Sequence, residues 1–134
     1  MAREDVQVVL DQFAAVNGRD FPRAMGHYAE DVELVVDSDA FLESGRFKGR
    51  DAVGRWFGNW FRTFEPGYRF EIEEARDLGD HVLLIASHRG RGRASGVEVR
   101  GETAYLYRVR DGEVVRAELY SSGAEALAAA GLTG

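Results

Sequence analysis

The stretch Ala104–Tyr120 reads AYLYRVRDGEVVRAELY, and it contains two runs in which apolar and polar side chains alternate. Alternation with a period of two is typical of a β-strand that has one buried face. Asp111 and Gly112 separate the two runs. Asp-Gly favours a type I′ turn, whose twist matches that of paired strands. The sequence therefore predicts a β-hairpin near the end of the chain.

The same period of two extends backward from this hairpin through the second half of the chain. It predicts four strands at about 68–75, 81–93, 97–110 and 113–122. Leu78-Gly79-Asp80 and Ser95-Gly96 supply the other turns, since glycine and aspartate favour turn conformations. Four strands joined by short turns predict a meander.

The first half of the chain has helical periodicity instead. Apolar residues recur near every 3.6 positions and predict helices at 4–17, at about 20–28 and at 51–64, the last carrying the densest aromatic cluster. In the second helix Asp20 is the expected N-cap, and Tyr28 is expected on its apolar face. The remaining elements are a strand at 32–37, a loop or one-turn helix at 38–48 that contains Phe41 and Phe47, and a short helix at 125–130. Helices followed by strands predict an α+β fold in one domain, 1–134.

Composition narrows the classes of function. The 134 residues include 17 basic and 23 acidic side chains, a net charge of −6 that does not favour a nucleic-acid or anionic-membrane surface. The segment HRGRGR, 88–93, resembles a short RG-rich RNA-binding tract, but it lies within a predicted strand, and we interpret it as a solvated strand edge. The chain therefore has the composition of a protein that binds neither nucleic acid nor membrane.

The chain contains no cysteine, which excludes disulfides and thiolate metal sites. Its three histidines do not have the spacing of metal ligands, so we expect no metal and no other cofactor. The N-terminal stretch lacks the basic start and apolar block of a signal peptide, and no apolar run approaches membrane-spanning length. We therefore expect a cytoplasmic protein.

Several segments occur in an order that resembles the SnoaL-like branch of the NTF2-like superfamily. They are GRD (18–20), YAEDVELVV (28–36), GRFKGRDAV (45–53), DLGDHVLL (77–84) and YRVRDGEVVRAELY (107–120). The resemblance implies a cone-shaped, curved mixed sheet packed on three N-terminal helices and enclosing a pocket. The superfamily includes polyketide cyclases, steroid isomerases, epoxide hydrolases and dehydratases, as well as members that bind a ligand or a partner without catalysis. The resemblance therefore leaves function open.

Strand alternation predicts which side chains face the pocket. On the last strand the inward set is Val115, Ala117, Leu119 and Ser121, with Tyr120 facing outward. On the preceding strand it is Val99, Gly101, Thr103, Tyr105 and Tyr107. The resemblance places Leu84, Ala86 and His88 inside.

His88 is then the one histidine predicted in the pocket, and it is the leading candidate for acid-base catalysis near neutral pH. Tyr105 is the candidate donor of a hydrogen bond to a carbonyl or enolate oxygen. Two other interpretations are open: His88 at a wet cavity mouth, and Tyr105 as a packing residue. Asp37 and Asp39 are expected to be solvated. The predicted substrate-binding residues are Phe13, Trp56, Trp60, Ala86, Tyr107, Leu119 and Ser121.

The catalytic mechanisms of similar proteins fit the residues of this sequence to different degrees. Catalytic positions of the steroid isomerases register with Gln12, Val36 and Tyr105, where only the tyrosine could keep a donor role. Those of limonene-epoxide-hydrolase-like members register with His88, Ala86 and Leu119, so their charged triad is absent. An aldol cyclisation of the polyketide-cyclase type needs one acid-base group in an apolar pocket, and it is the least contradicted.

Two hypotheses follow from these residues. The first is a cofactor-free cyclase, isomerase or lyase that acts on a small apolar carbonyl compound through His88 and Tyr105. The second is a non-catalytic domain that binds a small apolar molecule or associates with a partner. The resemblance also implies a homodimer. Its expected contact is the outer sheet face, where apolar side chains would otherwise meet water: Leu83, Ile85, Ala104 and Leu106.

Overall fold

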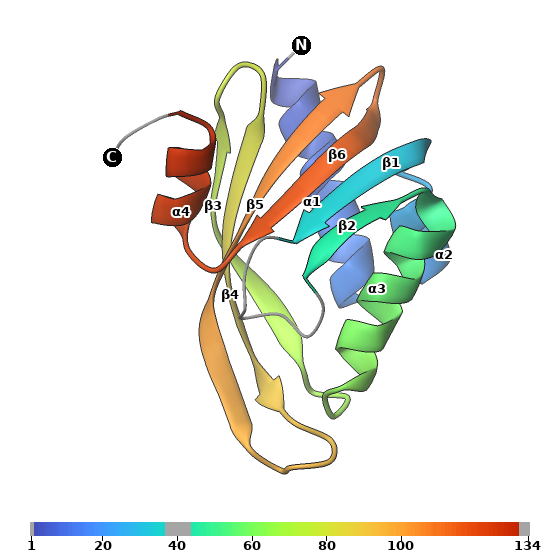
Figure 1. The fold of residues 1–134 in the computed structure, drawn as a ribbon, viewed down its shortest axis with the longest axis vertical. Helices are drawn as coiled ribbons and strands as arrows, with labels where there is room; N and C mark the ends of the chain where they lie inside the picture. Colours follow the sequence, from blue (N-terminus) through green and yellow to red (C-terminus); the bar gives the residue numbers. More distant parts are fainter. Residues whose placement is uncertain (1, 37–43, 132–134) are drawn as a thin grey trace.

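The computed structural model describes residues 2–36 and 44–131, and its elements follow the predicted order (Figure 1). The helices are α1 (Ala2–Asn17), α2 (Phe21–Met25), α3 (Arg50–Arg62) and α4 (Gly123–Ala129). The strands are β1 (Tyr28–Val36), β2 (Gly45–Lys48), β3 (Arg69–Asp77), β4 (Val82–Arg91), β5 (Glu98–Arg110) and β6 (Glu113–Tyr120). None of the helices in these described ranges is long and apolar enough to cross a membrane.

One mixed sheet contains all six of these strands, in the spatial order β2-β1-β6-β5-β4-β3. Neighbouring strands are antiparallel except for β1 and β6, which are parallel. The meander from β3 to β6 is therefore confirmed. Asp111 and Gly112 have φ values of 52° and 79°, and positive φ at both central residues is what a type I′ hairpin turn requires.

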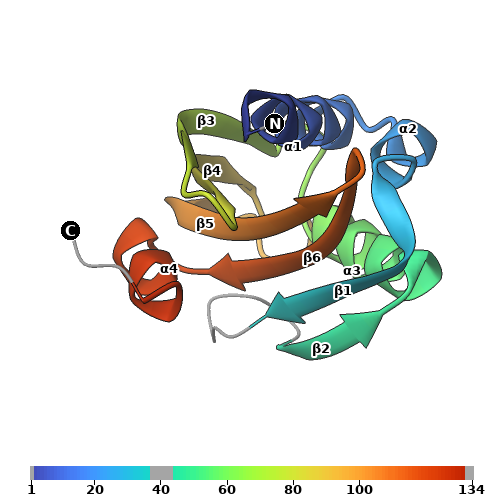
Figure 2. The same cartoon turned by 90° about the horizontal axis from the view of Figure 1, so that it is seen from above.

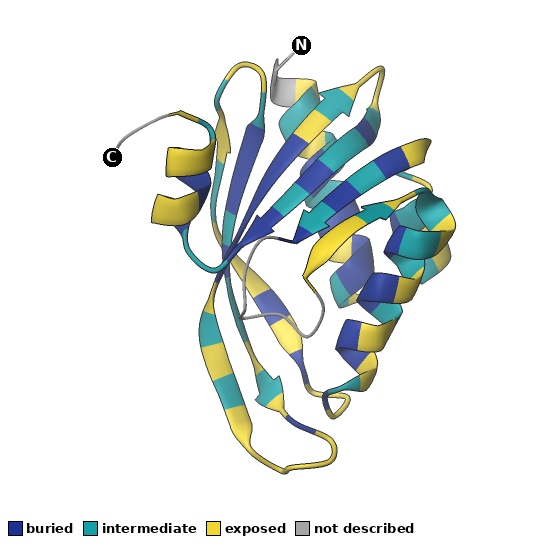
Figure 3. Cartoon of the chain, viewed as in Figure 1, coloured by how far each residue is buried: buried dark blue, intermediate teal, exposed yellow. Residues whose placement is uncertain are grey.

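The sheet curves around its helices, with α1 and α3 on the concave side and α4 on the opposite side (Figure 2). The apolar stripe of α3 predicted from sequence is buried against the sheet, while its other face is exposed (Figure 3). The predicted α+β class with a curved sheet is confirmed. An aromatic-rich core lies between the helices and the concave face.

Two residues lie in a different kind of element than the sequence predicts. Tyr28 begins β1 instead of extending the second helix, because α2 ends at Met25 and Val114 donates a backbone hydrogen bond to the carbonyl of His27. Phe47, predicted in a loop or one-turn helix, lies in β2, which pairs with β1. Asp37, Asp39 and Phe41 lie outside the described residues.

The predicted faces of β6 are correct from Ala117 to Tyr120 and wrong at the start of the strand. Ala117 and Leu119 are buried in the core as expected, but Val114 takes the core position predicted for Val115. The cause is an irregularity in the β5–β6 register between Arg108 and Val109, which strict alternation cannot anticipate.

The outer face of the sheet carries a second apolar cluster. Leu83, Ala104 and Leu106 are at most 1% exposed because α4 covers them with Ala126 and Leu127. Tyr120 faces outward as predicted, and there it is buried in the same cluster. The face expected to form the homodimer contact is therefore covered by α4, and the homodimer itself stays a prediction.

Candidate functional site

The inner faces of β4 and β5 carry the predicted site residues. Leu84 pairs with Tyr105, Ala86 with Thr103, and His88 with Gly101. The paired side chains point to the same face of the sheet, and Leu84, Ala86 and Tyr105 belong to the core under the helices. The inward orientation predicted for β4 is thus confirmed.

His88 and Tyr105 do not form a direct pair. Their register positions are four residues apart along the strands, roughly 13 Å. The ring of Phe70 lies between them, with centroids 6.2 Å from His88 and 6.3 Å from Tyr105. Tyr105 is 1% exposed, and its burial raises the pKa of the phenol, so the hydroxyl keeps its proton.

His88 instead belongs to a chain of three hydrogen-bonded rings, which we call the Trp60–Tyr68–His88 relay. Trp60 Nε1 donates to the hydroxyl oxygen of Tyr68 over 2.8 Å. The same hydroxyl lies 2.8 Å from Nδ1 of His88. Sequence reasoning missed Tyr68, because nothing local distinguishes it from any aromatic residue that begins a strand after Pro66-Gly67.

The relay fixes the tautomer of His88. Indole Nε1–H can only donate, so the Tyr68 oxygen is its acceptor, and the single O–H of Tyr68 is then available to donate to His88 Nδ1. Neutral His88 therefore carries its proton on Nε2. The opposite tautomer would leave the buried Tyr68 O–H without its acceptor, at a cost of roughly 1–3 kcal/mol.

Burial keeps the whole relay neutral. It lowers the pKa of His88 below its ordinary value, since the imidazolium form loses hydration. It raises the pKa of Tyr68 far above its ordinary value for the same reason. At neutral pH, His88 is consequently an uncharged hydrogen-bond donor at Nε2 and a poor base there.

Two glycines make room for the relay. A Cβ at Gly90 would lie 2.6 Å from Cδ1 and 2.9 Å from Cα of Tyr68, so the aromatic residue packs directly on the backbone of β4. A Cβ at Gly101 would lie 3.2 Å from Nε2 of His88. Because Gly101 has no side chain, β5 leaves the donor edge of the imidazole uncovered.

These contacts explain the HRGRGR segment differently from its sequence interpretation. β4 is an interior strand of the sheet, so the segment is not at an edge, although Arg89 and Arg91 are exposed. Arg89 approaches Glu71 on β3 at 3.7 Å. Gly90 is required by the packing of Tyr68.

The other predicted binding residues divide into two groups. Six are buried in the main core: Phe13, Trp56, Trp60, Ala86, Tyr107 and Leu119. Ser121 lies beyond the end of β6, so strand alternation does not extend to it, and its hydroxyl donates to Glu125 of α4.

Deep in the core, Gln12 and Tyr28 form a second polar position. Gln12 Oε1 and Tyr28 Oη are buried without a hydrogen-bond partner. Burial raises the pKa of Tyr28, so its hydroxyl stays protonated. Gln12 stands where the resemblance placed a steroid-isomerase tyrosine, and its side chain keeps donor and acceptor atoms at that place.

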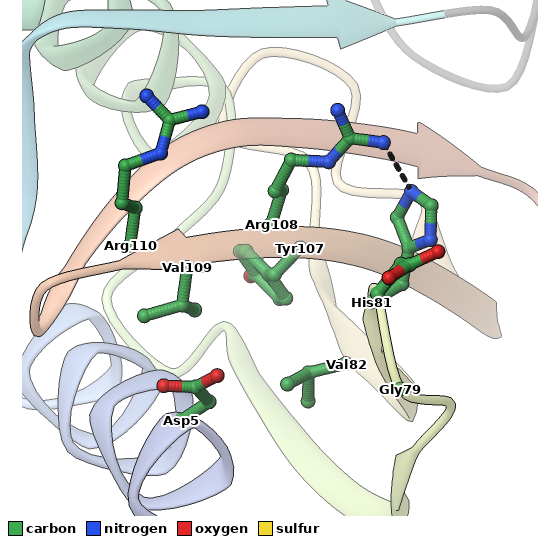
Figure 4. Close-up of a pocket in the computed structure, with 9 residues that line it drawn as sticks. Asp5, Gly79, His81, Val82, Tyr107, Arg108, Val109 and Arg110 are labelled. Carbon is green, nitrogen blue, oxygen red and sulfur yellow. Dashed lines mark hydrogen bonds between the residues drawn. The ribbon is translucent and has the colours of Figure 1, made fainter. Parts of the chain in front are cut away.

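Four described pockets open elsewhere on the surface, and neither His88 nor Tyr105 lines any of them. One of about 440 Å³ lies between the start of α1 and the β4–β5 strands, lined by Asp5, Tyr107 and Val109 (Figure 4). At its rim, Nη2 of Arg108 lies 3.4 Å from Nε2 of His81.

Residues 2–36 and 44–131 contain no cluster of three or more side chains that could ligate a metal.

The family model of the SnoaL-like domain matches residues 9–117. The chain belongs to the SnoaL-like family. No curated protein matches this SnoaL-like chain significantly.

Solved structures share the fold of this SnoaL-like protein. An NTF2-like protein from Burkholderia thailandensis E264 is 26% identical, with a TM-score of 0.78 and coverage of 87% of this chain and 88% of that one. A putative SnoaL-like polyketide cyclase from Jannaschia sp. CCS1 is 18% identical, with a TM-score of 0.78 and coverage of 89% and 85%. TerC co-crystallised with polyporic acid is 18% identical, with a TM-score of 0.76 and coverage of 96% and 97%. At the lower two identities the likeness is one of fold.

Proposed function

We propose that this SnoaL-like protein binds a small, apolar, carbonyl-containing molecule and donates a hydrogen bond from His88 Nε2 to the carbonyl oxygen. The observation that carries the proposal is the Trp60–Tyr68–His88 relay, which favours a neutral imidazole with its proton on Nε2. The aromatic core around the relay favours an apolar ligand body.

A donor at this position suits reactions in which negative charge develops on a carbonyl oxygen. Enolisation and intramolecular aldol closure are of this kind, and a prepositioned donor stabilises the charge without reorganising. A neutral imidazole with a lowered pKa can polarise a carbonyl in this way. The proposed activity is therefore a cofactor-free isomerase- or cyclase-type reaction, as in part of the superfamily.

A second candidate is a binding domain without turnover. It is favoured by the separation of His88 from Tyr105 and by the lack, within the described ranges, of a carboxylate hydrogen-bonded to the relay. Such a protein would hold the same class of ligand, with the His88 donor providing specificity and not catalysis.

The experiment combines binding and turnover. Small cyclic ketones, lactones and 1,3-diketones are screened by thermal shift and histidine NMR against wild type, His88→Leu and the control His27→Leu. For a ligand that binds, we expect the carbonyl stretching frequency to fall in wild type and His27→Leu but not in His88→Leu. If the ligand is converted, His88→Leu should lower kcat by about a hundredfold, as loss of one oxyanion donor does.

The outcomes separate the candidates. Binding without conversion, lost in His88→Leu, supports the binding domain. A ligand whose affinity, carbonyl frequency and turnover are all unchanged in His88→Leu would overturn both.

A further inference from the structure

A groove of about 490 Å³ lies between α2, α3 and the segment that joins α3 to β3. Its floor is apolar and includes Phe21, Phe61, Phe64 and Pro66. Three arginines line it, namely Arg19, Arg62 and Arg93. These apolar and cationic side chains take no part in the hydrogen bonds of the Trp60–Tyr68–His88 relay.

The three arginines have no acidic partner within residues 2–36 and 44–131. Arg62 donates to the side-chain oxygen of Asn59, and Arg93 donates to the carbonyls of Arg62 and Phe64 at 3.3 and 3.2 Å. Each guanidinium has five N–H donors, so most of these donors remain available to a ligand.

Arg19 is held in place before any ligand arrives. Its backbone has a φ of 61°, a conformation that side chains other than glycine rarely adopt. Its guanidinium lies 4.2 Å from the centroid of the Phe61 ring and donates to the carbonyls of Asn17 and Tyr68. Burial lowers the pKa of Arg19, yet an arginine remains charged at neutral pH.

On the α3 side, two glycines line the groove without side chains that would narrow it. Gly54 and Gly58 both line it from the interior of α3, where glycine weakens a helix. A Cβ at Gly58 would lie 3.3 Å from Nη1 of Arg62. The absence of a side chain there lets the arginine lie back along the helix beside the apolar floor.

We propose that this groove binds a small carboxylate attached to an apolar, aromatic body. The planar guanidinium fork matches a carboxylate in two parallel hydrogen bonds, and the phenylalanine rings offer stacking surfaces to the body. Glu65 also lines the groove, and its carboxylate opposes a second negative charge on the ligand. A monoanion therefore fits better than a dianion.

The groove is distinct from the proposed carbonyl site. Phe64 stacks on Tyr68 with centroids 4.1 Å apart and Phe61 is 5.6 Å from it, so this aromatic layer separates the groove from the relay. The inference does not depend on the proposed function, and its test uses binding alone.

The probe is 2-naphthoate, with 2-naphthamide as its neutral counterpart. In an NMR titration we expect the acid to bind at least about tenfold more tightly than the amide, because only the acid forms charge-assisted bonds to arginine. The signals of the Phe61 and Phe64 rings and of the arginine Nε–H groups should shift. Equal affinity for acid and amide, or no binding of either, would overturn the proposal.

Variants locate the site. Arg62→Gln removes an exposed guanidinium whose described hydrogen bond is to its helix neighbour Asn59. It should weaken naphthoate binding about tenfold and leave naphthamide binding unchanged. Arg93→Gln is the second variant, and thermal unfolding checks that each protein is folded. The control is Arg55→Gln, an exposed α3 arginine outside the groove, which should bind as wild type does. Unchanged naphthoate affinity in both folded variants would refute the site.

Discussion

Tyr68 is the residue on which the chemistry of His88 depends, because its hydroxyl accepts from Trp60 and donates to His88. Tyr68→Phe removes both bonds and leaves the Trp60 N–H without that acceptor. We expect a loss of about 1–3 kcal/mol of unfolding free energy and a mixture of His88 tautomers. Nitrogen-15 NMR of the imidazole measures the tautomer.

Tyr105→Phe is the matched control for this change, since Tyr105 is also buried but lies four register positions from His88. Its His88 spectrum should match wild type. An unchanged Nε2–H tautomer in Tyr68→Phe would show that the relay does not select it.

The lowered pKa of His88 gives stability a definite pH dependence. The folded protein binds a proton at His88 less readily than the unfolded chain, whose pKa is near the ordinary 6.5. Protons therefore favour unfolding, so the free energy of unfolding falls as pH drops below about 6.5 and levels off below the folded pKa. Urea denaturation between pH 5 and about 8 measures this dependence. In His88→Gln the free energy of unfolding should change less steeply with pH than in wild type. An identical slope in the variant would contradict the assignment.

At the scale of elements, Gly90 determines how closely Tyr68, the residue before β3, approaches β4. Gly90→Ala places a methyl group against the backbone of Tyr68, which cannot move as a flexible side-chain end could. We expect a loss of about 1–3 kcal/mol and disruption of the Tyr68–His88 bond, as overpacking causes. Gly67→Ala is the nearby control, because no atom outside its adjacent residues lies within 4 Å of its Cβ position. Chemical denaturation of both variants measures the difference. If Gly90→Ala is no less stable than Gly67→Ala, the proposed role of Gly90 is refuted.

α3 contains a glycine whose replacement should stabilise the protein. Gly54 lies in the helix interior, and an added Cβ would make an ordinary 3.4 Å contact with Sδ of Met25. Gly54→Ala is expected to raise the free energy of unfolding by about 0.5–1 kcal/mol, because alanine restricts the unfolded chain. Urea unfolding measures it. A destabilised variant would mean that Met25 cannot yield.

The elements were predictable where a local pattern determines them. Asp111-Gly112 encodes its own turn, and the aromatic stripe of α3 encodes its buried face. Tyr28 was misplaced because it begins a strand only through its pairing with β6. The relay was out of reach for the same reason, since Tyr68 and His88 are twenty residues apart and meet only when β3 pairs with β4.

At the scale of the whole molecule, α4 closes the outer face of the sheet. A chain ending at Ser121 would expose Leu83, Ala104 and Leu106 together, and we expect it to self-associate at micromolar concentration. Sedimentation velocity compares the shortened chain with the full chain. In the full chain α4 covers this face, so the proposed dimer must use another surface. If the shortened chain and the full chain sediment as the same species, α4 does not shield this face.

The stacking around Trp60 also has an optical consequence. The indole of Trp60 lies 6.2 Å from the His88 ring and is joined to it through one phenol. Imidazolium quenches indole emission at such short range, whereas neutral imidazole does so weakly. In a Trp56→Phe background, the fluorescence of Trp60 should thus dim as His88 gains its proton, so the protein carries its own indicator of the charge at this residue.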